Sequence, residues 1–203
     1  MINVKDIKQS EEFFYYIEDK CRFVIGQKKG TPLICIGLNP STATPSAPDP
    51  TYCKLMKIAT NEKNNFDSTI VFNLYPYIAT EPKDLPKQED EEIIQKNIDV
   101  IKTVLNEFEK CKEPITICAC WGAGIEKRTY LKECLNKIYK TLNASGKEII
   151  WKRIDAGNYK HPHHPLYMDG DIELSEFTDS IATYIKEISK SNKNCTKKEP
   201  FGS

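Results

Sequence analysis

The sequence predicts an α/β fold with three layers (α/β/α), in which helices cover both faces of a mostly parallel, four-stranded central sheet. Four short apolar runs, at residues 32–37, 69–74, 115–121 and 149–154, have the length of strands. Their apolarity is unbroken, which is typical of strands buried on both faces of a parallel sheet. Segments with apolar residues at helical spacing separate the runs. This alternation of strand and helix favours parallel strands joined by helical crossovers.

The N-terminal segment is expected to add a helix and an antiparallel strand. Ser10 is a suitable N-cap, so residues 11–20 are interpreted as a short helix. Residues 22–25 alternate weakly between apolar and polar, and the turn at 26–30 leads from them into the first apolar run. This arrangement predicts an antiparallel strand at the edge of the sheet.

Capping residues mark where the later helices begin. Asp49-Pro50 joins an N-cap residue to a proline suited to the first helical position, which predicts a helix over about residues 51–61. Asp90 opens the clearest helix, whose isoleucines, valine and leucine recur at helical spacing. Two more helices are expected, one ending near Leu142 and one over residues 175–189.

Length and charge limit the class of protein. The 203 residues are most simply one domain over 1–189, followed by a Lys/Asn/Ser-rich tail at 190–203 that is expected to be disordered. Basic and acidic residues both number 29, so net charge gives no case for binding a polyanion or an acidic membrane, although a local basic edge would suffice for nucleic acid. Without an apolar signal core or a segment of transmembrane length, a soluble, cytoplasmic protein with no membrane partner is expected. These totals do not indicate the oligomeric state.

The eight cysteines are expected to be reduced thiols, because no export signal and no Cys-x-x-Cys pair is present. Cys118 and Cys120 flank one residue, so on a strand they point to the same face. Two interpretations follow, namely small residues filling the core and a pair of metal ligands.

Polar residues end each apolar run, at what should be one edge of the sheet. Open α/β folds bind ligands at the carboxyl ends of their parallel strands. An amide offers a donor and an acceptor side by side, which suits the edge of a planar heterocycle, and a neutral imidazole donates to an oxygen that gains negative charge. We therefore expect a nucleobase, a nucleotide or a nucleic acid as the partner. The segments concerned are Gly37-Leu38-Asn39-Pro40-Ser41, Phe72-Asn73-Leu74, Trp121-Gly122-Ala123-Gly124 and His161-Pro162-His163-His164-Pro165-Leu166.

The order of these motifs resembles two protein families. Gly-x-Asn-Pro, apolar-Asn-Leu, Trp-Gly and a histidine-proline motif, in this sequence order, are distantly similar to the uracil-DNA glycosylase superfamily. A closer resemblance, over about residues 21–167, is to the bacterial and phage family called domain of unknown function 1643. Its matching motifs here are Leu38-Asn39-Pro40-Ser41-Thr42-Ala43, Asp49-Pro50-Thr51, Asn73-Leu74, Ala79-Thr80-x-Pro82, Trp121-Gly122 and His164-Pro165-Leu166-Tyr167. The first resemblance implies a uracil-DNA-glycosylase-like fold.

The glycosylase resemblance also implies roles for individual residues. Asn39 would position an attacking water, and Asn73 would bind the edge of an extruded base. His164 would stabilise the oxygen of the departing base anion, and Leu166 would fill the vacated stack. Asp49 is a further catalytic candidate if its loop folds inward. The expected substrate-binding positions are Gly37, Ser41, Asn73, Trp121, Gly122, Leu166 and Tyr167.

Several alternatives stay open at this point. Asn39 stands where the uracil-specific enzymes have a carboxylate, and Asp49 is also explained as a helix cap. A non-catalytic module that binds or sequesters a nucleotide is therefore the second hypothesis. A metal-dependent hydrolase built on the three histidines, at 161, 163 and 164, is the third. No cofactor is expected, and which of the three imidazoles enters the site is not indicated.

Overall fold

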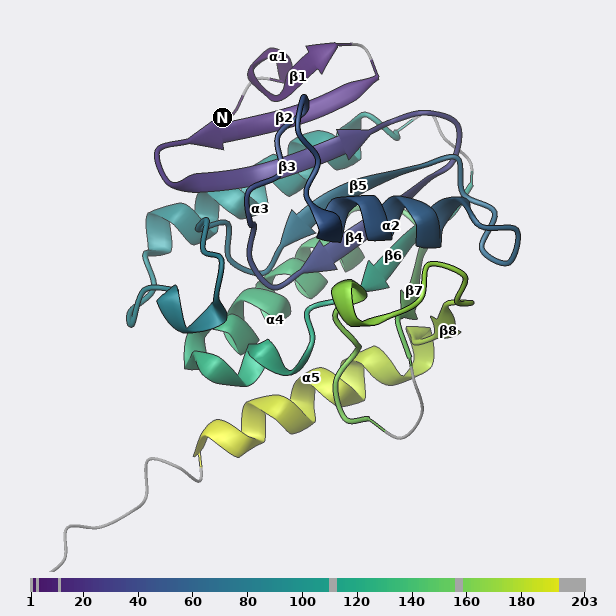
Figure 1. Cartoon of the computed structure of the whole chain (residues 1–203). Helices are drawn as coiled ribbons and strands as arrows, with labels where there is room; N and C mark the ends of the chain where they lie inside the picture. Colours follow the sequence, from purple (N-terminus) through teal and green to yellow (C-terminus); the bar gives the residue numbers. More distant parts are fainter. Residues whose placement is uncertain (1, 3, 11, 110–112, 156–158, 194–203) are drawn as a thin grey trace, which may run out of the picture.

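The computed structural model describes residues 2, 4–10, 12–109, 113–155 and 159–193 (Figure 1). Its helices are α1 (Val4–Ile7), α2 (Pro50–Thr60), α3 (Glu91–Asn106), α4 (Thr129–Asn143) and α5 (Thr178–Lys193), with 3₁₀ turns at Pro82–Asp84, Ala123–Lys127 and Pro165–Tyr167. Its strands are β1 (Lys8–Ser10), β2 (Phe13–Glu18), β3 (Cys21–Gln27), β4 (Pro32–Gly37), β5 (Ser68–Asn73), β6 (Ile115–Ala119), β7 (Ile149–Arg153) and β8 (Ser175–Glu176). In the described part of the chain they form one eight-stranded sheet in the order β1-β2-β3-β5-β4-β6-β7-β8.

The four predicted central strands are confirmed. β5, β4, β6 and β7 are neighbours and pair in parallel. β4 lies between β5 and β6, with Gly37 opposite Asn73 and Ile36 opposite Ala119. The carboxyl ends of these strands therefore meet at one edge, which is the geometry that lets separate motifs share a site.

The sheet is wider than predicted, because antiparallel strands flank the parallel centre. β3 pairs antiparallel with β5, as expected for residues 22–25, but it is not the edge strand, since β2 and β1 continue the sheet beyond it. On the other side β8 pairs antiparallel with β7.

The prediction of a helix over residues 11–20 is wrong. Residues 13–18 form β2, which makes a hairpin with β3 through a tight turn at Asp19 and Lys20, and residue 11 lies outside the described residues. Asp19 has a φ of 51°, a conformation that short turns use. The run of aromatic residues has high strand propensity, and burying Phe14 in the core decides the outcome over the N-cap signal.

The last helix is also displaced from its predicted bounds. Residues 175–176 form β8, and α5 begins at Thr178 and continues to Lys193. Residues 190–193 are therefore helical, where the sequence predicted a disordered tail. The rest of that predicted tail, at 194–203, lies outside the described residues.

Helices cover both faces of the sheet, which confirms the three layers (Figure 1). α3, α4 and α5 pack on one face through a large cluster that includes Val100, Leu135 and Ile181. α2 packs on the other face with Leu55 and Ile58. Among the described residues, no helix has both the length and the apolarity that crossing a bilayer requires.

The α4 face of the core offers a direct test of this packing. Leu135 is fully buried on α4, so we expect Leu135→Ala to lower the free energy of unfolding by about 2–5 kcal/mol. The matched control is Glu133→Ala, at an exposed position of the same helix, which should change it by less than about 0.5 kcal/mol. Urea unfolding measures both variants, and equal effects would contradict the assigned burial.

Candidate functional site

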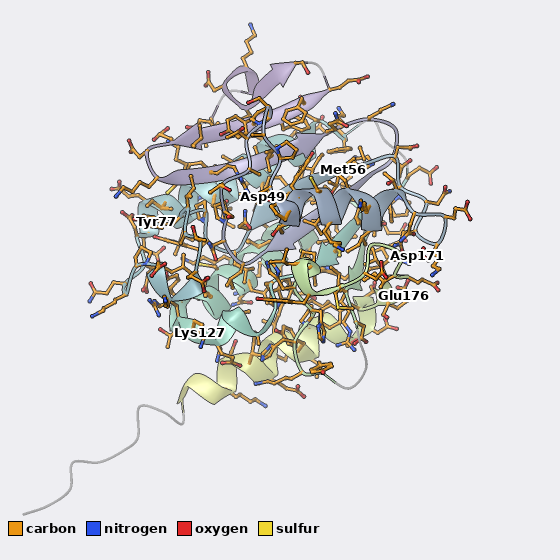
Figure 2. All side chains as sticks on the ribbon, in the orientation of Figure 1. Asp49, Met56, Tyr77, Lys127, Asp171 and Glu176 are labelled. Carbon is orange, nitrogen blue, oxygen red and sulfur yellow. The ribbon has the colours of Figure 1, made fainter. Side chains whose placement is uncertain are left out.

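A pocket of about 810 Å³ lies at the carboxyl edge of the parallel strands. Its walls come from the end of β4 and the loop after it, the first turn of α2, the segment after β6 and the 3₁₀ turn at Pro165–Tyr167. Figure 2 labels Asp49, at the start of α2, and Lys127, on the turn after β6, which contribute to this lining. The lining includes all the site residues that the sequence predicted: Gly37, Asn39, Ser41, Asp49, Asn73, Trp121, Gly122, His164, Leu166 and Tyr167.

Asn39 is held by the long proline-containing loop that follows β5. Its Nδ2 donates to the carbonyl oxygens of Ala79, at 2.6 Å, and Pro40, at 3.0 Å. Only the NH₂ group can donate to two carbonyls, so the orientation of the amide is determined. Its Oδ1 accepts no hydrogen bond from the described residues and is the atom left for a water or a ligand.

Asn73 lies deeper, with 4 % of its surface exposed. Its backbone carbonyl accepts a 3.0 Å hydrogen bond from Asn97 Nδ2, which anchors the end of β5. Its own Nδ2 is buried and has no partner among the described residues. A buried amide without a partner is costly. The hydrogen-bonding capacity of Nδ2 is therefore unused among the described residues, and Asn73 is one of the residues that line the pocket.

Gly37 makes room for that amide. A Cβ at Gly37 would stand 2.7 Å from Asn73 Oδ1, closer than side chains tolerate. The sequence predicted only that Gly37 allows a close approach, and the group that approaches is the side chain of Asn73.

His164 caps the 3₁₀ turn that begins at Pro165. Its Nδ1 accepts a hydrogen bond from the backbone N–H of Leu166 at 3.3 Å, so the neutral ring carries its proton on Nε2. Burial lowers the pKa of His164, and the negative charge of Asp49 opposes this shift in part. The imidazole is thus a neutral hydrogen-bond donor at neutral pH.

Two contacts position His164 at the edge of the sheet. The backbone N–H of His163 donates to the Ile154 carbonyl at 2.8 Å, which extends the chain beside the end of β7. A Cβ at Gly122 would stand 3.2 Å from His164 Cβ. Gly122 also has φ 67° and ψ −175°, a backbone region that is open almost exclusively to glycine.

Asp49 is confirmed as the cap of α2, and its loop does fold inward. Oδ1 accepts from the Tyr52 N–H at 2.8 Å, and Oδ2 accepts from the Ala43 N–H at 3.2 Å. The carboxylate is buried in the pocket wall, and both of its oxygens already accept backbone hydrogen bonds. Its role as a catalytic base stays a prediction.

Trp121 contributes shape to the pocket. Its ring is 1 % exposed, packs against Trp151 and donates from Nε1 to Tyr184 Oη at 3.0 Å. Cys35, Cys118 and Cys120 are fully buried on the α2 face of the sheet, which agrees with their interpretation as core residues.

The other two histidines have different surroundings. His161 Nδ1 lies 2.8 Å from Tyr184 Oη, and its Nε2 lies 3.4 Å from Glu126 Oε1. The ring of His163 packs edge-on against Tyr159. Of the three imidazoles, His164 is the one that lines the pocket. No cluster of three or more metal-ligating side chains is present in the part of the chain that the structure describes.

Two exposed residues with large apolar surfaces belong to the pocket lining. Leu166 is 46 % exposed and Tyr167 is 80 % exposed, and both line the mouth of the pocket.

Sequence analysis missed several polar residues of the lining, which are Arg22, Tyr52, Thr80, Glu81, Glu126 and Lys127. Arg22 is the most deeply placed of them, because it reaches the pocket from the antiparallel strand β3 with 5 % of its surface exposed. Burial raises the pKa of Tyr52 to about 12, so its phenol stays protonated. A charged residue next to the apolar residues 23–25 of the same strand is the signal that could have identified Arg22.

One comparison with known proteins finds a relationship. The model of the family described as "Protein of unknown function (DUF1643)" matches residues 22–166. No curated protein and no solved structure matches the chain.

The space beside Gly122 can be tested against a second glycine. Gly122→Ala should destabilise the protein by about 1–3 kcal/mol and displace His164, because of its backbone conformation and the 3.2 Å contact. Gly146→Ala is the matched control, since Gly146 also has positive φ, at 72°, but has nothing within 4 Å of a Cβ. Urea unfolding and the NMR signals of the His164 ring distinguish the two. Equal perturbation of His164 by both variants would argue against the packing described.

The protonation state of His164 sets a second expectation. Because burial lowers its folded-state pKa, the unfolded chain binds this proton more tightly, and the group destabilises the fold as pH falls through about 6.5. NMR titration should give His164 a pKa below about 6.5, with the His164→Gln spectrum assigning the signal. A pKa above that value would show that the pocket favours imidazolium.

Proposed function

This chain belongs to the DUF1643 family, and we propose that its pocket binds a nucleobase and hydrolyses the N-glycosidic bond of a nucleoside, a nucleotide or a DNA base. One observation carries the proposal. Asn39, Asn73 and His164, which come from three separate parts of the chain, all line one pocket with hydrogen-bonding atoms that the protein does not use.

The three groups are complementary to a base. The Asn73 amide offers donor and acceptor atoms side by side, as a Watson–Crick edge requires. The Nε2–H of His164 is a neutral donor suited to a carbonyl oxygen of the base. The pocket volume of about 810 Å³ falls within the range of small-molecule sites.

The proposed chemistry uses water as the nucleophile. Asn39 Oδ1 accepts a hydrogen bond from the water and orients its oxygen toward the anomeric carbon. As the C–N bond breaks, its electron pair moves onto the base, and His164 Nε2–H stabilises the oxygen that becomes negative. The water oxygen bonds to the sugar carbon, and the proton it loses ends on the departing base. The distant resemblance to the uracil-DNA glycosylase superfamily supports these roles, with Leu166 at the rim as the residue that would occupy the vacated stack.

A second function, binding without catalysis, is favoured by the state of the carboxylates. Asp49 uses both oxygens on backbone N–H groups, and Glu126 forms ion pairs with Lys132 and Lys160. Glu81, the third carboxylate of the lining, is exposed to solvent. If none of the three carboxylates acts as a base, the pocket holds a nucleotide without cleaving it.

A measurement of base release distinguishes hydrolysis from binding without catalysis. The protein is assayed for base release from uracil-, mismatch- and modified-base DNA and from free nucleosides. Asn39→Ala and His164→Ala should each lower the rate by about 100-fold or more, because each removes a group that acts on the reacting atoms. His163→Ala, in the same loop but outside the pocket, is the control and should keep the wild-type rate.

Three outcomes are informative. Release that is unchanged in both pocket variants would refute the assigned roles. Ligand-induced thermal stabilisation of the wild type without any product would support the binding function. If the protein neither binds any of these ligands nor releases a base, both proposed functions are refuted.

A further inference from the structure

Arg22 carries a buried guanidinium whose hydrogen-bonding groups are mostly unused. Nη1 donates to the Ala43 carbonyl at 2.7 Å. Nε is buried without a partner, and Nη2 donates to nothing in the described part of the chain. A guanidinium presents five N–H donors in a fixed fork. Nη2 and the second N–H of Nη1 are thus the donors left for a group that enters the pocket, which Arg22 lines.

The charge of Arg22 is also poorly compensated. Burial lowers its pKa, and Asp49 opposes this shift without forming an ion pair with it. The Asp49 oxygens accept hydrogen bonds from Ala43 and Tyr52 instead. Buried charges are normally paired, because leaving the solvent is costly for an ion. An anionic group bound in the pocket would supply the missing partner.

The first turn of α2 adds to the positive potential beside Arg22. Pro50, Thr51 and Tyr52 all line the pocket at the amino end of this helix. The Tyr52 N–H donates to Asp49. The Thr51 N–H also belongs to the first turn of the helix, where backbone amides have no partner within the helix. Helix amino ends favour anions, and here that effect acts together with the guanidinium.

We propose that Arg22 binds the phosphate of a free mononucleotide, so that the ligand of this pocket is a nucleoside monophosphate rather than a free base, a nucleoside or DNA. This proposal rests on the proposed function, which assigns the binding of the base, and Arg22 would bind the other part of the ligand, the phosphate. A planar guanidinium binds phosphate through two parallel hydrogen bonds. Arg22 is only 5 % exposed. A small ligand can enter whole and reach it, whereas the backbone of a duplex stays at the rim.

The test compares ligands that differ by one phosphate. Isothermal titration calorimetry measures the four common ribonucleosides, their 5′-monophosphates, inorganic phosphate and a single-stranded oligonucleotide against the wild type, Arg22→Gln and Arg22→Lys. The wild type should bind one monophosphate at least tenfold more tightly than its nucleoside. Arg22→Gln should abolish this preference, and Arg22→Lys, which keeps the charge but loses the fork, should retain part of it. Lys57→Gln, an equal charge change at an exposed position of α2, should behave as the wild type.

Stability measurements keep the test decisive. Arg22→Gln removes a buried charge and a buried Nε without a partner, so the ligand-free variant should unfold at a urea concentration no lower than the wild type does. If it does not fold, Arg22→Lys decides the result. Equal affinity of the wild type for nucleoside and monophosphate, or a preference that survives in Arg22→Gln, would overturn the proposal. Tighter binding of the oligonucleotide than of any mononucleotide would overturn it in favour of DNA.

The outcomes also separate this inference from the proposed function. Nucleoside binding that is equal in the wild type and Arg22→Gln, with no gain from the phosphate, would leave the base site standing and remove the phosphate site. Arg22-dependent binding of inorganic phosphate without any nucleoside binding would support the phosphate site and remove the base site.

Discussion

The parallel pairing of β4 with β5 is the constraint on which the pocket depends. It places Gly37 opposite Asn73 at the last position of both strands. Because Gly37 has no Cβ, the Asn73 amide occupies the space directly against the β4 backbone. The ladder continues past the strand ends, where the Leu74 N–H donates to the Gly37 carbonyl at 2.9 Å. The chain that follows, including Asn39, is therefore held at a defined distance from Asn73.

Backbone groups, rather than other side chains, orient most of the polar residues in the pocket. Asn39 is held by the Ala79 carbonyl, and His164 by the Leu166 N–H. Each of these contacts uses one polar atom of the side chain and leaves the other for a ligand. The buried Nδ2 of Asn73 and Nε of Arg22 have no such contact. Unpaired buried groups lower stability, and they are retained where a site requires them.

Much of this arrangement could be predicted from the sequence, because parallel strands and helix caps have local signals. The four apolar runs identified β4, β5, β6 and β7, and the rule that ligands bind at strand ends pointed to Asn39, Asn73 and His164, which line the pocket. The run of aromatic residues at the start of β2 fits either strand or helix, so the N-cap signal at Ser10 was misleading. Arg22 has a local signal, because it is a charged residue within a strand, but its place in the pocket depends on a contact with Ala43, far along the chain.

The central claim is that a base lies against the Asn73 amide with one of its oxygens at His164, and a crystal structure with a bound nucleoside tests it most directly. We expect the base edge within hydrogen-bond distance of the Asn73 amide, a base oxygen facing His164 Nε2 and a water on Asn39 Oδ1. A nucleoside bound outside this pocket, or inside it with the sugar against Asn73 and the base at the rim, would contradict the account.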